Sequence, residues 1–238
     1  MSQAPQLSVV VPAYDEEGAI AGVVRGWAAM LDRLGVAYEI RVYDDGSRDG
    51  TAAVLDALAR EVPALVVVHQ ENRGHGPTVL RGYREARGAW IFQVDGDDEL
   101  PPDAFPTLWA LRNDADLVLG IRTGRVQPIG RRIVSAVSRL AVRLLFGRGV
   151  HDVNVPYRLH RRAVLEGLLP LVPDDTFAPN VALTGLAVRQ GLVIREVPVL
   201  HRPRRTGTSS FGRLSMWRSA ARALRETLSI ARRARATP

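Results

Sequence analysis

Residues 92–103 read FQVDGDDELPPD, and the features that decide the fold meet in this stretch. The apolar run from Trp90 to Val94 is typical of a buried strand. Ionised carboxylates are costly to bury unless a cation or a hydrogen-bond donor faces them. The run is nevertheless followed at once by four acids, namely Asp95, Asp97, Asp98 and Glu99. A strand that ends in this way raises the question of which group lies opposite these acids.

Strand-like and helical patterns alternate along the chain around this stretch. Short apolar runs predict strands, and apolar residues at helical spacing between them predict helices. Such alternation is typical of an α/β fold with a mostly parallel central sheet that is flanked by helices. We expect strands at 7–14, 39–45, 64–70, 90–97 and 116–122, and helices at about 16–34, 49–60 and 76–86.

Composition narrows the class of protein. The 238 residues are 46% hydrophobic, which is enough for a substantial core in one large domain or two small ones. The absence of cysteine excludes disulfides and thiolate metal ligands, and no apolar run is long enough for a membrane span. The N-terminus lacks the pattern of a secretory signal, so we expect a cytoplasmic protein. A net charge of +7, carried entirely by arginine, allows a nucleic acid, an anionic membrane or a phosphorylated substrate as partner.

Polar residues also follow two other predicted strands. Tyr14 and Glu16 lie in VVPAYDEEGAI, and Asp44 and Asp45 lie in VYDDGSRDGT. Such acids can be part of a strand–turn–helix corner in which the helix dipole favours them. They can equally bind the base and ribose of a nucleotide, because ligands of parallel sheets bind at the carboxyl ends of the strands.

The spacing of Asp95 and Asp97 has two interpretations as well. Acidic turns are common, and a lone D-x-D pair is weak evidence for a metal. Two carboxylates just past a strand end can also bracket Mg²⁺ or Mn²⁺, which prefers oxygen ligands together with substrate phosphates. Because several strand ends carry polar residues here, we favour a metal–diphosphate opposite these acids.

Four motifs, taken together, resemble those of glycosyltransferase family 2. The stretches VVPAYDEE, DDGSRDGT, NRGHGPTVLRGYREARG and VDGDDEL occur in the order typical of that family. The resemblance implies a GT-A (Rossmann-like) fold and transfer of a sugar from a nucleotide-diphosphate donor, with inversion and with Mg²⁺ or Mn²⁺. It implies a metal site at Asp95 and Asp97. Glu99 stands where the family often has a glutamine near the metal, and it can replace that glutamine as a third metal ligand or be a simple surface acid. The resemblance also implies that the nucleotide sugar binds at Pro12, Tyr14, Glu16, Asp44, Asp45, Asp95 and Gly96.

The second half of the chain is similar to the polyprenyl-phosphate branch of that family, the dolichol-phosphate mannose synthase type. The resemblance implies transfer of a hexose from GDP-mannose or a UDP-hexose to a polyprenyl phosphate. It places the acceptor phosphate at Arg122, Arg131, Ser135 and Arg204, and the catalytic residues at Asp97, Arg122, Arg131 and Arg204. Each arginine taken singly is equally typical of a solvated surface charge. The stretch DVNVPYR departs from the pattern of the branch, and this leaves the acceptor open.

Two other functions compete with this one. The first is a glycosyltransferase with a soluble acceptor, such as a secondary metabolite. The second is a non-enzymatic basic protein that binds nucleic acid; against it, the arginines are not interleaved with aromatic stacking residues. We therefore expect no nucleic-acid partner. The histidines His75, His151 and His160 share no helical spacing, which favours ordinary surface or loop residues, although His75 lies in a glycine-rich loop that could contact a diphosphate.

We expect the chain to be one continuous unit with a C-terminal appendage. We place a catalytic domain at 1–212 and a basic amphipathic helix at 213–238. The apolar face of this helix comprises Met216, Trp217, Ala220, Leu224 and Leu228. Such a helix can lie in a membrane interface as a peripheral contact on the cytoplasmic face, or it can pack on the catalytic domain. The sequence supports both equally.

Overall fold

The structure is a computed structural model that describes residues 4–124, 136, 140, 142–147, 150–203 and 213–236, and of the last stretch the side chains of 218–234. Helices and strands alternate along the chain, as predicted. They are β1 (Leu7–Ala13), α1 (Ile20–Leu34), β2 (Tyr38–Asp44), α2 (Thr51–Glu61), β3 (Leu65–His69), α3 (His75–Glu85), β4 (Trp90–Val94), α4 (Phe105–Ala110), β5 (Leu117–Thr123), β6 (Tyr157–Arg161), α6 (Arg162–Leu168), α7 (Pro179–Arg189), β7 (Ile194–Leu200) and α8 (Arg213–Ala236).

The strands form one seven-stranded sheet in the order β3-β2-β1-β4-β6-β5-β7. All neighbours are parallel except that β6 runs antiparallel to both β4 and β5. The strand order reverses between β1 and β4, because β2 and β3 extend the sheet on one side of β1 and β4 extends it on the other. Ala13 at the end of β1 lies opposite Asp44 at the end of β2, so the carboxyl ends of these strands are level. The predicted α/β class with a mostly parallel sheet is confirmed.

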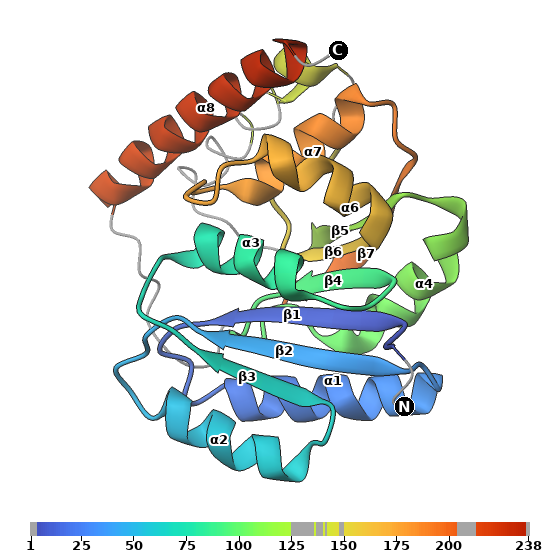
Figure 1. The fold of residues 1–238 in the computed structure, drawn as a ribbon, viewed down its shortest axis with the longest axis vertical. Coiled ribbons are helices and arrows are strands. Elements are labelled where there is room, and N and C mark those ends of the chain that lie inside the picture. Colours follow the sequence, from blue (N-terminus) through green and yellow to red (C-terminus); the bar gives the residue numbers. More distant parts are fainter. Residues whose placement is uncertain are drawn as a thin grey trace.

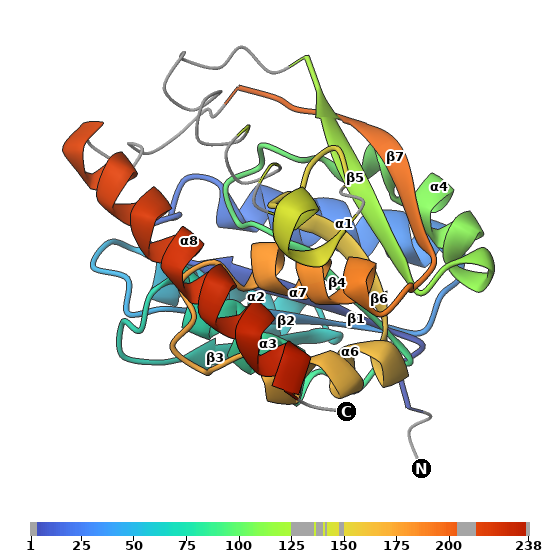
Figure 2. The same ribbon diagram turned by 90° about the horizontal axis from the view of Figure 1, so that it is seen from above.

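Helices cover both faces of the sheet. Helices α1 and α2 pack together on one face, whereas α3, α6 and α7 lie on the other, with α8 outside α7 (Figures 1 and 2). This arrangement follows from the strand order, since a right-handed crossover that turns the opposite way along the sheet places its helix on the opposite face. Because β1, β2 and β4 run parallel, the loops that follow them lie at one edge of the sheet (Figure 1).

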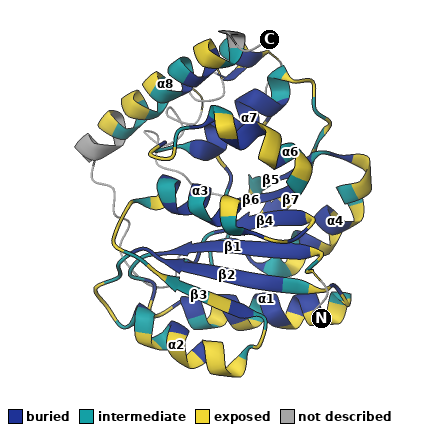
Figure 3. Cartoon of the chain, viewed as in Figure 1, coloured by how far each residue is buried: buried dark blue, intermediate teal, exposed yellow. Residues whose placement is uncertain are grey.

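An aromatic cluster fills the core beneath that edge. Phe92 on β4 is fully buried, and its ring centroid lies 4.9 Å from that of Trp27, 4.8 Å from that of Phe105 and 4.8 Å from that of Tyr157. Edge-to-face and tilted pairs of this kind stabilise a core beyond the area that they bury. Figure 3 shows that the central strands are buried along their length. The cluster joins α1 and α4 to the middle of the sheet, which gives the loop after β4 a rigid base.

Strand β6 corrects one sequence-based expectation. We expected His160 to be an ordinary surface or loop residue, and this was wrong, because His160 lies on β6 between β4 and β5 and is fully buried. Among the described residues neither of its ring nitrogens has a hydrogen-bond partner, and burial lowers the pKa of His160 well below its ordinary value. The imidazole is therefore a neutral core side chain. Its partner is Tyr83, whose ring packs edge-on at 5.4 Å between centroids.

Helix α8 packs against the rest of the protein through its second half. The side chains of Thr227, Ile230 and Ala231 are buried, and the Arg189 Nη1 group on α7 donates a hydrogen bond to the Ala231 carbonyl at 3.2 Å. The opposite face is exposed (Figure 3). Of the two arrangements left open by the sequence, the described part of α8 adopts packing on the catalytic domain. The division of the chain into two domains at residue 212 stays a prediction.

Two glycines provide a matched test of how closely α3 and α1 pack on their neighbours. A Cβ on Gly82 of α3 would collide with Val10 of β1 and come within 3.1 Å of Tyr43 Cε2, whereas a Cβ on Gly22 of α1 would meet nothing within 4 Å. Gly82→Ala should therefore lower the free energy of unfolding by about 1–3 kcal/mol through overpacking. Gly22→Ala should raise it by about 0.5–1 kcal/mol through better helix propensity. Urea denaturation measures both, and equal effects of the two variants would contradict this account.

Candidate active site

The predicted site residues meet where the strand order reverses. Pro12 lies near the end of β1 and Tyr14 just after it. Asp44 ends β2 and Asp45 follows it, and the DGDDEL segment follows β4. The crevice at such a reversal is where open α/β sheets bind their ligands. Because β1 has β2 on one side and β4 on the other, residues that are far apart in sequence share this edge.

The loops after β1 and β2 are locked together by the acids of the first motif. The backbone N–H of Arg48 donates to Asp15 Oδ1 at 2.7 Å, and that of Gly50 donates to Glu17 Oε2 at 2.9 Å. In return the Glu16 N–H donates to Thr51 Oγ1 at 2.9 Å. Asp15 and Glu17 thus satisfy backbone amides of the turn that precedes α2, so these two acids have a structural role. The predicted nucleotide-binding residue Glu16 is buried between the two loops, and the predicted role itself stays a prediction.

Asp45 holds the glycine-rich loop in place. Its carboxylate accepts hydrogen bonds from the backbone N–H groups of Arg73 and Gly74, at 2.8 and 2.9 Å, and from Gln70 Nε2 at 2.6 Å. Three donors thus satisfy the buried carboxylate of Asp45. Asp45 therefore organises the loop before α3 from within the site.

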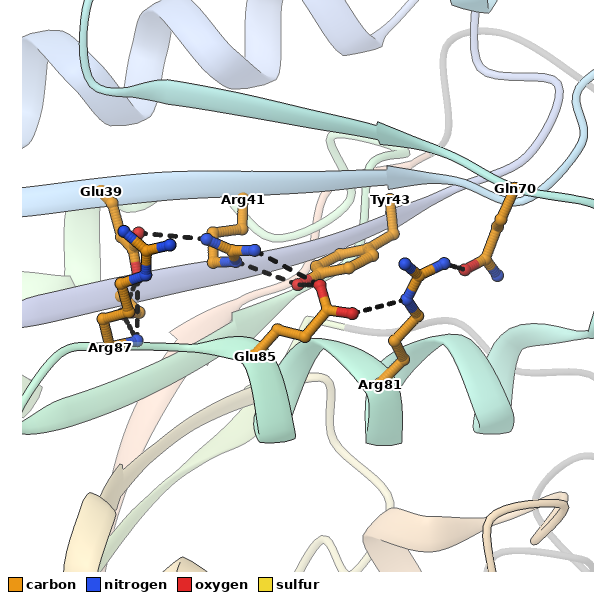
Figure 4. A network of polar contacts seen from close by, with 8 residues as sticks. Glu39, Arg41, Tyr43, Gln70, Arg81, Glu85 and Arg87 are labelled. Atoms are coloured by element: carbon orange, nitrogen blue, oxygen red, sulfur yellow. Dashed lines mark hydrogen bonds and ion pairs between the residues drawn. The ribbon is translucent and has the colours of Figure 1, made fainter.

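Gln70 belongs to a polar network between β2 and α3 that the sequence did not reveal (Figure 4). Arg81 Nη1 donates to Gln70 Oε1 at 2.8 Å, and Arg81 Nε donates to Glu85 Oε1 at 2.7 Å. Glu85 Oε2 accepts from the Tyr43 hydroxyl at 3.0 Å and from Arg41 Nη2 at 3.3 Å. The only signal in the sequence is the i, i+4 spacing of Arg81 and Glu85. The network thus holds Gln70, which is one of the three donors to Asp45.

Asp44 is held by a histidine that sequence reasoning missed. The His69 Nδ1 atom at the end of β3 lies 2.8 Å from Asp44 Oδ2, and the Ser47 N–H donates to Asp44 Oδ1 at 3.0 Å. Asp56 contacts the other ring nitrogen at 3.2 Å. The hydrogen bond with Asp44 raises the pKa of His69, against an opposing effect of burial, and Asp56 adds to the increase. The orientation of the predicted nucleoside ligand Asp44 thus depends on the end of a neighbouring strand.

The acids after β4 are crowded. His75 Nε2 lies 3.0 Å from Asp95 Oδ1, and the Glu99 N–H donates to Asp97 Oδ1 at 3.2 Å. The pKa of Asp97 is raised to about 7, first by burial and then by the charges of Asp95, Glu99 and Glu16. Like-charged groups at close range disfavour ionisation of each other. This carboxyl is therefore electrostatically unsatisfied in the protein alone.

The predicted three-ligand metal set is not preassembled. In the part of the chain that the structure describes, no group of three or more histidine or acid side chains is arranged to hold a metal ion. Glu99 Oε2 instead lies 2.9 Å from His201 Nε2, just after β7. Sequence reasoning missed His201, because its link to Glu99 spans 102 residues. Asp95 and Asp97 remain the two acids of the segment that could share a cation with a ligand phosphate.

The predicted acceptor residues are only partly covered by the structure. Arg122 lies on β5 and makes a two-pronged ion pair with Asp152, with Nε–Oδ2 and Nη2–Oδ1 distances of 2.7 and 2.9 Å. The predicted residues Arg131, Ser135 and Arg204 lie outside the described residues. Asp152 thus fixes the direction of the Arg122 guanidinium, and the predicted phosphate contact stays a prediction.

A buried arginine supports the loop that carries Asp152. Arg158 on β6 is fully buried, and its guanidinium donates to the carbonyl oxygens of Val153, Val155 and Asn180 and to Thr184 Oγ1. Burial lowers the pKa of Arg158 to about 10, which leaves it charged at neutral pH. The stretch PYRLHRR gives no sign of this, because it reads as a surface run of basic residues.

The profile of glycosyl transferase family 2 matches residues 8–169. The chain belongs to this family. The match covers β1 through α6 and includes every acid described above. The family predicted from the motifs is confirmed, and membership decides against the non-enzymatic alternative. No helix in the described part of this family 2 chain is long and apolar enough to span a membrane.

Curated relatives and solved structures agree with this assignment. An undecaprenyl-phosphate 4-deoxy-4-formamido-L-arabinose transferase of Pseudomonas aeruginosa is 33% identical over 213 residues, covering 88% of this chain and 61% of that protein. The Sodalis glossinidius enzyme of the same name is 28% identical, covering 89% of this chain and 64% of that protein. The family 2 chain thus spans about three fifths of these relatives.

A solved structure shares the fold. The Mycobacterium tuberculosis glucosyl-3-phosphoglycerate synthase, crystallised with Mn²⁺, UDP and phosphoglyceric acid, has a TM-score of 0.73 and 23% identity. The match covers 95% of this chain and 78% of that one. The predicted GT-A fold of this family 2 chain is confirmed.

The contact between His69 and Asp44 predicts a pH effect on stability. The folded-state pKa of His69 lies above its unfolded value of about 6.5, so the folded protein binds the proton more tightly. The stabilisation is fully present below about pH 6.5 and is lost as pH rises through the folded pKa. The difference in unfolding free energy between wild type and His69→Gln should therefore shrink between about pH 6 and pH 8. Urea titrations across this range check it, and a constant difference would contradict it.

Proposed function

We propose that this protein transfers a hexose from a nucleotide-diphosphate sugar to a polyprenyl phosphate. The carrying observation is the pair of crowded carboxylates, Asp95 and Asp97, at the carboxyl end of β4 where the strand order reverses. A nucleotide sugar such as GDP-mannose or a UDP-hexose would bind across this edge. Its base and ribose would lie toward Asp44, its diphosphate toward Asp97, and the wall between them would be formed by Pro12, Tyr14, Glu16, Asp45 and Gly96.

The donor set fits a divalent cation. Asp95 and Asp97 supply only oxygen ligands, and the repulsion that adds to burial in raising the pKa of Asp97 is relieved when a cation lies between them. Mg²⁺ and Mn²⁺ commonly bind one or two carboxylates and take their other ligands from substrate phosphates, which agrees with a site that is not preassembled. Bound there, the cation would supply neutralisation of the charge that develops on the departing diphosphate.

Most of the residues proposed to bind the acceptor phosphate are arginines. A phosphate monoester is largely ionised at neutral pH, so it needs orientation and charge neutralisation rather than a general base. Arg122, whose direction Asp152 fixes, would bind the lipid phosphate together with Arg131, Ser135 and Arg204. The phosphate oxygen would then attack the anomeric carbon from the face opposite the diphosphate, with inversion. The names of the curated relatives, undecaprenyl-phosphate transferases, support this acceptor class.

A soluble phosphorylated acceptor is the second candidate. The structural neighbour from Mycobacterium tuberculosis was crystallised with phosphoglyceric acid, so its fold accommodates a small acceptor that also carries a phosphate. The two candidates share the arginine-bound phosphate and differ in where the acceptor resides. A polyprenyl acceptor requires the protein to work at the cytoplasmic face of the membrane as a peripheral protein, and a soluble acceptor does not.

The function is tested by a panel of donors and acceptors. GDP-mannose, UDP-glucose and UDP-GlcNAc are each incubated with Mn²⁺ or Mg²⁺, alone, with a short polyprenyl phosphate, or with phosphoglyceric acid. We expect release of the nucleotide diphosphate with one donor only when the polyprenyl phosphate is present. Release that depends on phosphoglyceric acid would replace the lipid acceptor by the soluble one. No release with any combination would contradict the proposed function.

Two neighbouring acids provide a matched test of the metal assignment. Asp97→Asn should lower kcat by about 10²–10³-fold, because an amide neither neutralises the cation nor supports the departing diphosphate. Asp98→Asn should leave kcat within about twofold, since asparagine tolerates the left-handed conformation that Asp98 adopts at φ 58°. Steady-state kinetics with saturating Mn²⁺ compares the two variants. An Asp97→Asn enzyme with wild-type kcat would remove Asp97 from the metal site.

A further inference from the structure

Besides packing on α7, helix α8 contacts residues 173–178. The backbone N–H of Phe177 donates to Glu226 Oε2 at 2.8 Å, and the Arg222 Nη2 group donates to the Asp175 carbonyl at 3.2 Å. Arg222 Nε also donates to Glu226 Oε1 at 2.8 Å, and its guanidinium lies 5.4 Å from the centre of the Phe177 ring. Glu226 is the one acid among the residues of α8, which include seven arginines. We name this set of contacts, Arg222 and Glu226 with Asp175 and Phe177, the α8 clamp.

The clamped segment presses on the beginning of α3. A Cβ on Gly76 would lie 2.6 Å from the Phe177 carbonyl oxygen and would collide with the Thr176 carbonyl oxygen as well. Only a glycine permits this approach, so the segment packs directly against the first turn of α3. The residue before Gly76 is His75, whose Nε2 lies 3.0 Å from Asp95 Oδ1. This is the first connection between the α8 clamp and the crowded acids.

A second series of contacts connects the C-terminal end of the segment 173–178 to Asp95. The chain enters α7 directly after residue 178, and Asn180 in the first turn donates from Nδ2 to Gln93 Oε1 at 2.9 Å. Gln93 Nε2 in turn donates to Asp95 Oδ1 at 3.3 Å. Asn180 and Gln93 are both buried, so these amides hold their partners without competition from water. Both connections end on the same oxygen atom of Asp95.

We propose that α8 is a positioning element of the donor site, and that its clamp on residues 173–178 orients Asp95 through His75 and Gln93. Glu226 and Arg222 are positioning residues, since neither side chain has a contact with Asp95 itself among those described. The proposal rests on the proposed function for the claim that Asp95 binds a metal–diphosphate. The mechanical coupling from α8 to Asp95 does not depend on that claim. A C-terminal helix with this role is part of the catalytic apparatus rather than an appendage.

The test compares three variants of the full chain with a control on the same helix. Glu226→Ala removes both contacts of the acid, Glu226→Gln keeps an oxygen that can accept from the Phe177 N–H, and Arg222→Ala removes the contact with Asp175. Arg225→Ala removes an exposed arginine next to Glu226 that has no contact with Asp175 or Phe177 among those described. Amide hydrogen exchange of the free protein is followed by mass spectrometry in peptides covering 74–85 and 90–98.

We expect Glu226→Ala and Arg222→Ala to accelerate exchange at the beginning of α3 and around Asp95. Glu226→Gln should have a smaller effect, and Arg225→Ala should match wild type. Wild-type exchange at 74–85 and 90–98 in both Glu226→Ala and Arg222→Ala would overturn the proposal. If Glu226→Ala does not fold, the comparison of Arg222→Ala with Arg225→Ala decides the same question.

A binding measurement separates this proposal from the proposed function. Calorimetric titration with UDP or GDP in the presence of Mn²⁺ should show affinity reduced about tenfold in Glu226→Ala and unchanged in Arg225→Ala, at matched melting temperatures. Wild-type affinity in a folded Glu226→Ala variant would overturn the positioning role. Absence of binding by the wild-type protein would contradict the proposed function instead, and the exchange measurement would still decide whether α8 positions Asp95.

Discussion

A buried carboxylate must be matched by donors or by a cation, and the architecture of this site follows from how each acid meets that requirement. Asp45 has three donors, and Asp44 has a histidine and a backbone amide. These acids hold loops in place. Asp97 has a single backbone donor and is surrounded by other acids, so its pKa is raised to about 7. Asp44 and Asp45 thus have a structural role beside the nucleotide contacts proposed for them, whereas Asp97, with a single donor, is available to a cation.

The sheet edge explains why these acids are neighbours at all. Parallel strands joined by helices all present their carboxyl ends on one side, and the reversal between β1 and β4 opens a crevice there. The sequence therefore predicts the location of the site without any knowledge of its chemistry, because apolar runs that end in acids are visible in one dimension. Strands β1 to β5 and helices α1 to α3 follow the predicted ranges closely, because apolar periodicity is also visible in one dimension, although β4 ends at Val94 rather than at residue 97.

The elements missed by the sequence are those whose environment is set by distant residues. Strand β6 contains Arg158 and His160, and a run of basic residues gives no periodic apolar signal. Its antiparallel place between β4 and β5 allows Arg158 to be satisfied by three carbonyl oxygens and a hydroxyl. Only that arrangement makes burial of a guanidinium tolerable. Composition and spacing describe the side chain, but not the donors and acceptors that will surround it.

The same limit applies to the candidate site. Sequence reasoning identified the acids, whereas the residues that orient them, among them His69, Gln70 and His201, are single polar residues without a motif. Helix α8 shows the physical reason most clearly. Its amphipathic pattern is compatible with a membrane surface and with packing on the domain, since both place apolar residues on one face. A single acid, Glu226, distinguishes the two, because its carboxylate has a defined partner, the Phe177 N–H, only in the packed arrangement.

The family match ends at residue 169, before the C-terminal elements that contact the site. Residues 8–169 contain every acid of the donor edge, whereas Asn180, His201 and Glu226 lie beyond them. The acids of the edge thus lie within the stretch that matches the family, whereas the proposed α8 clamp lies in the C-terminal third of this chain. Orientation of a carboxylate by a few tenths of an ångström is sufficient to change catalysis. Under the proposed coupling, changes in the C-terminal elements alter how the acids of the edge are held without altering the acids themselves.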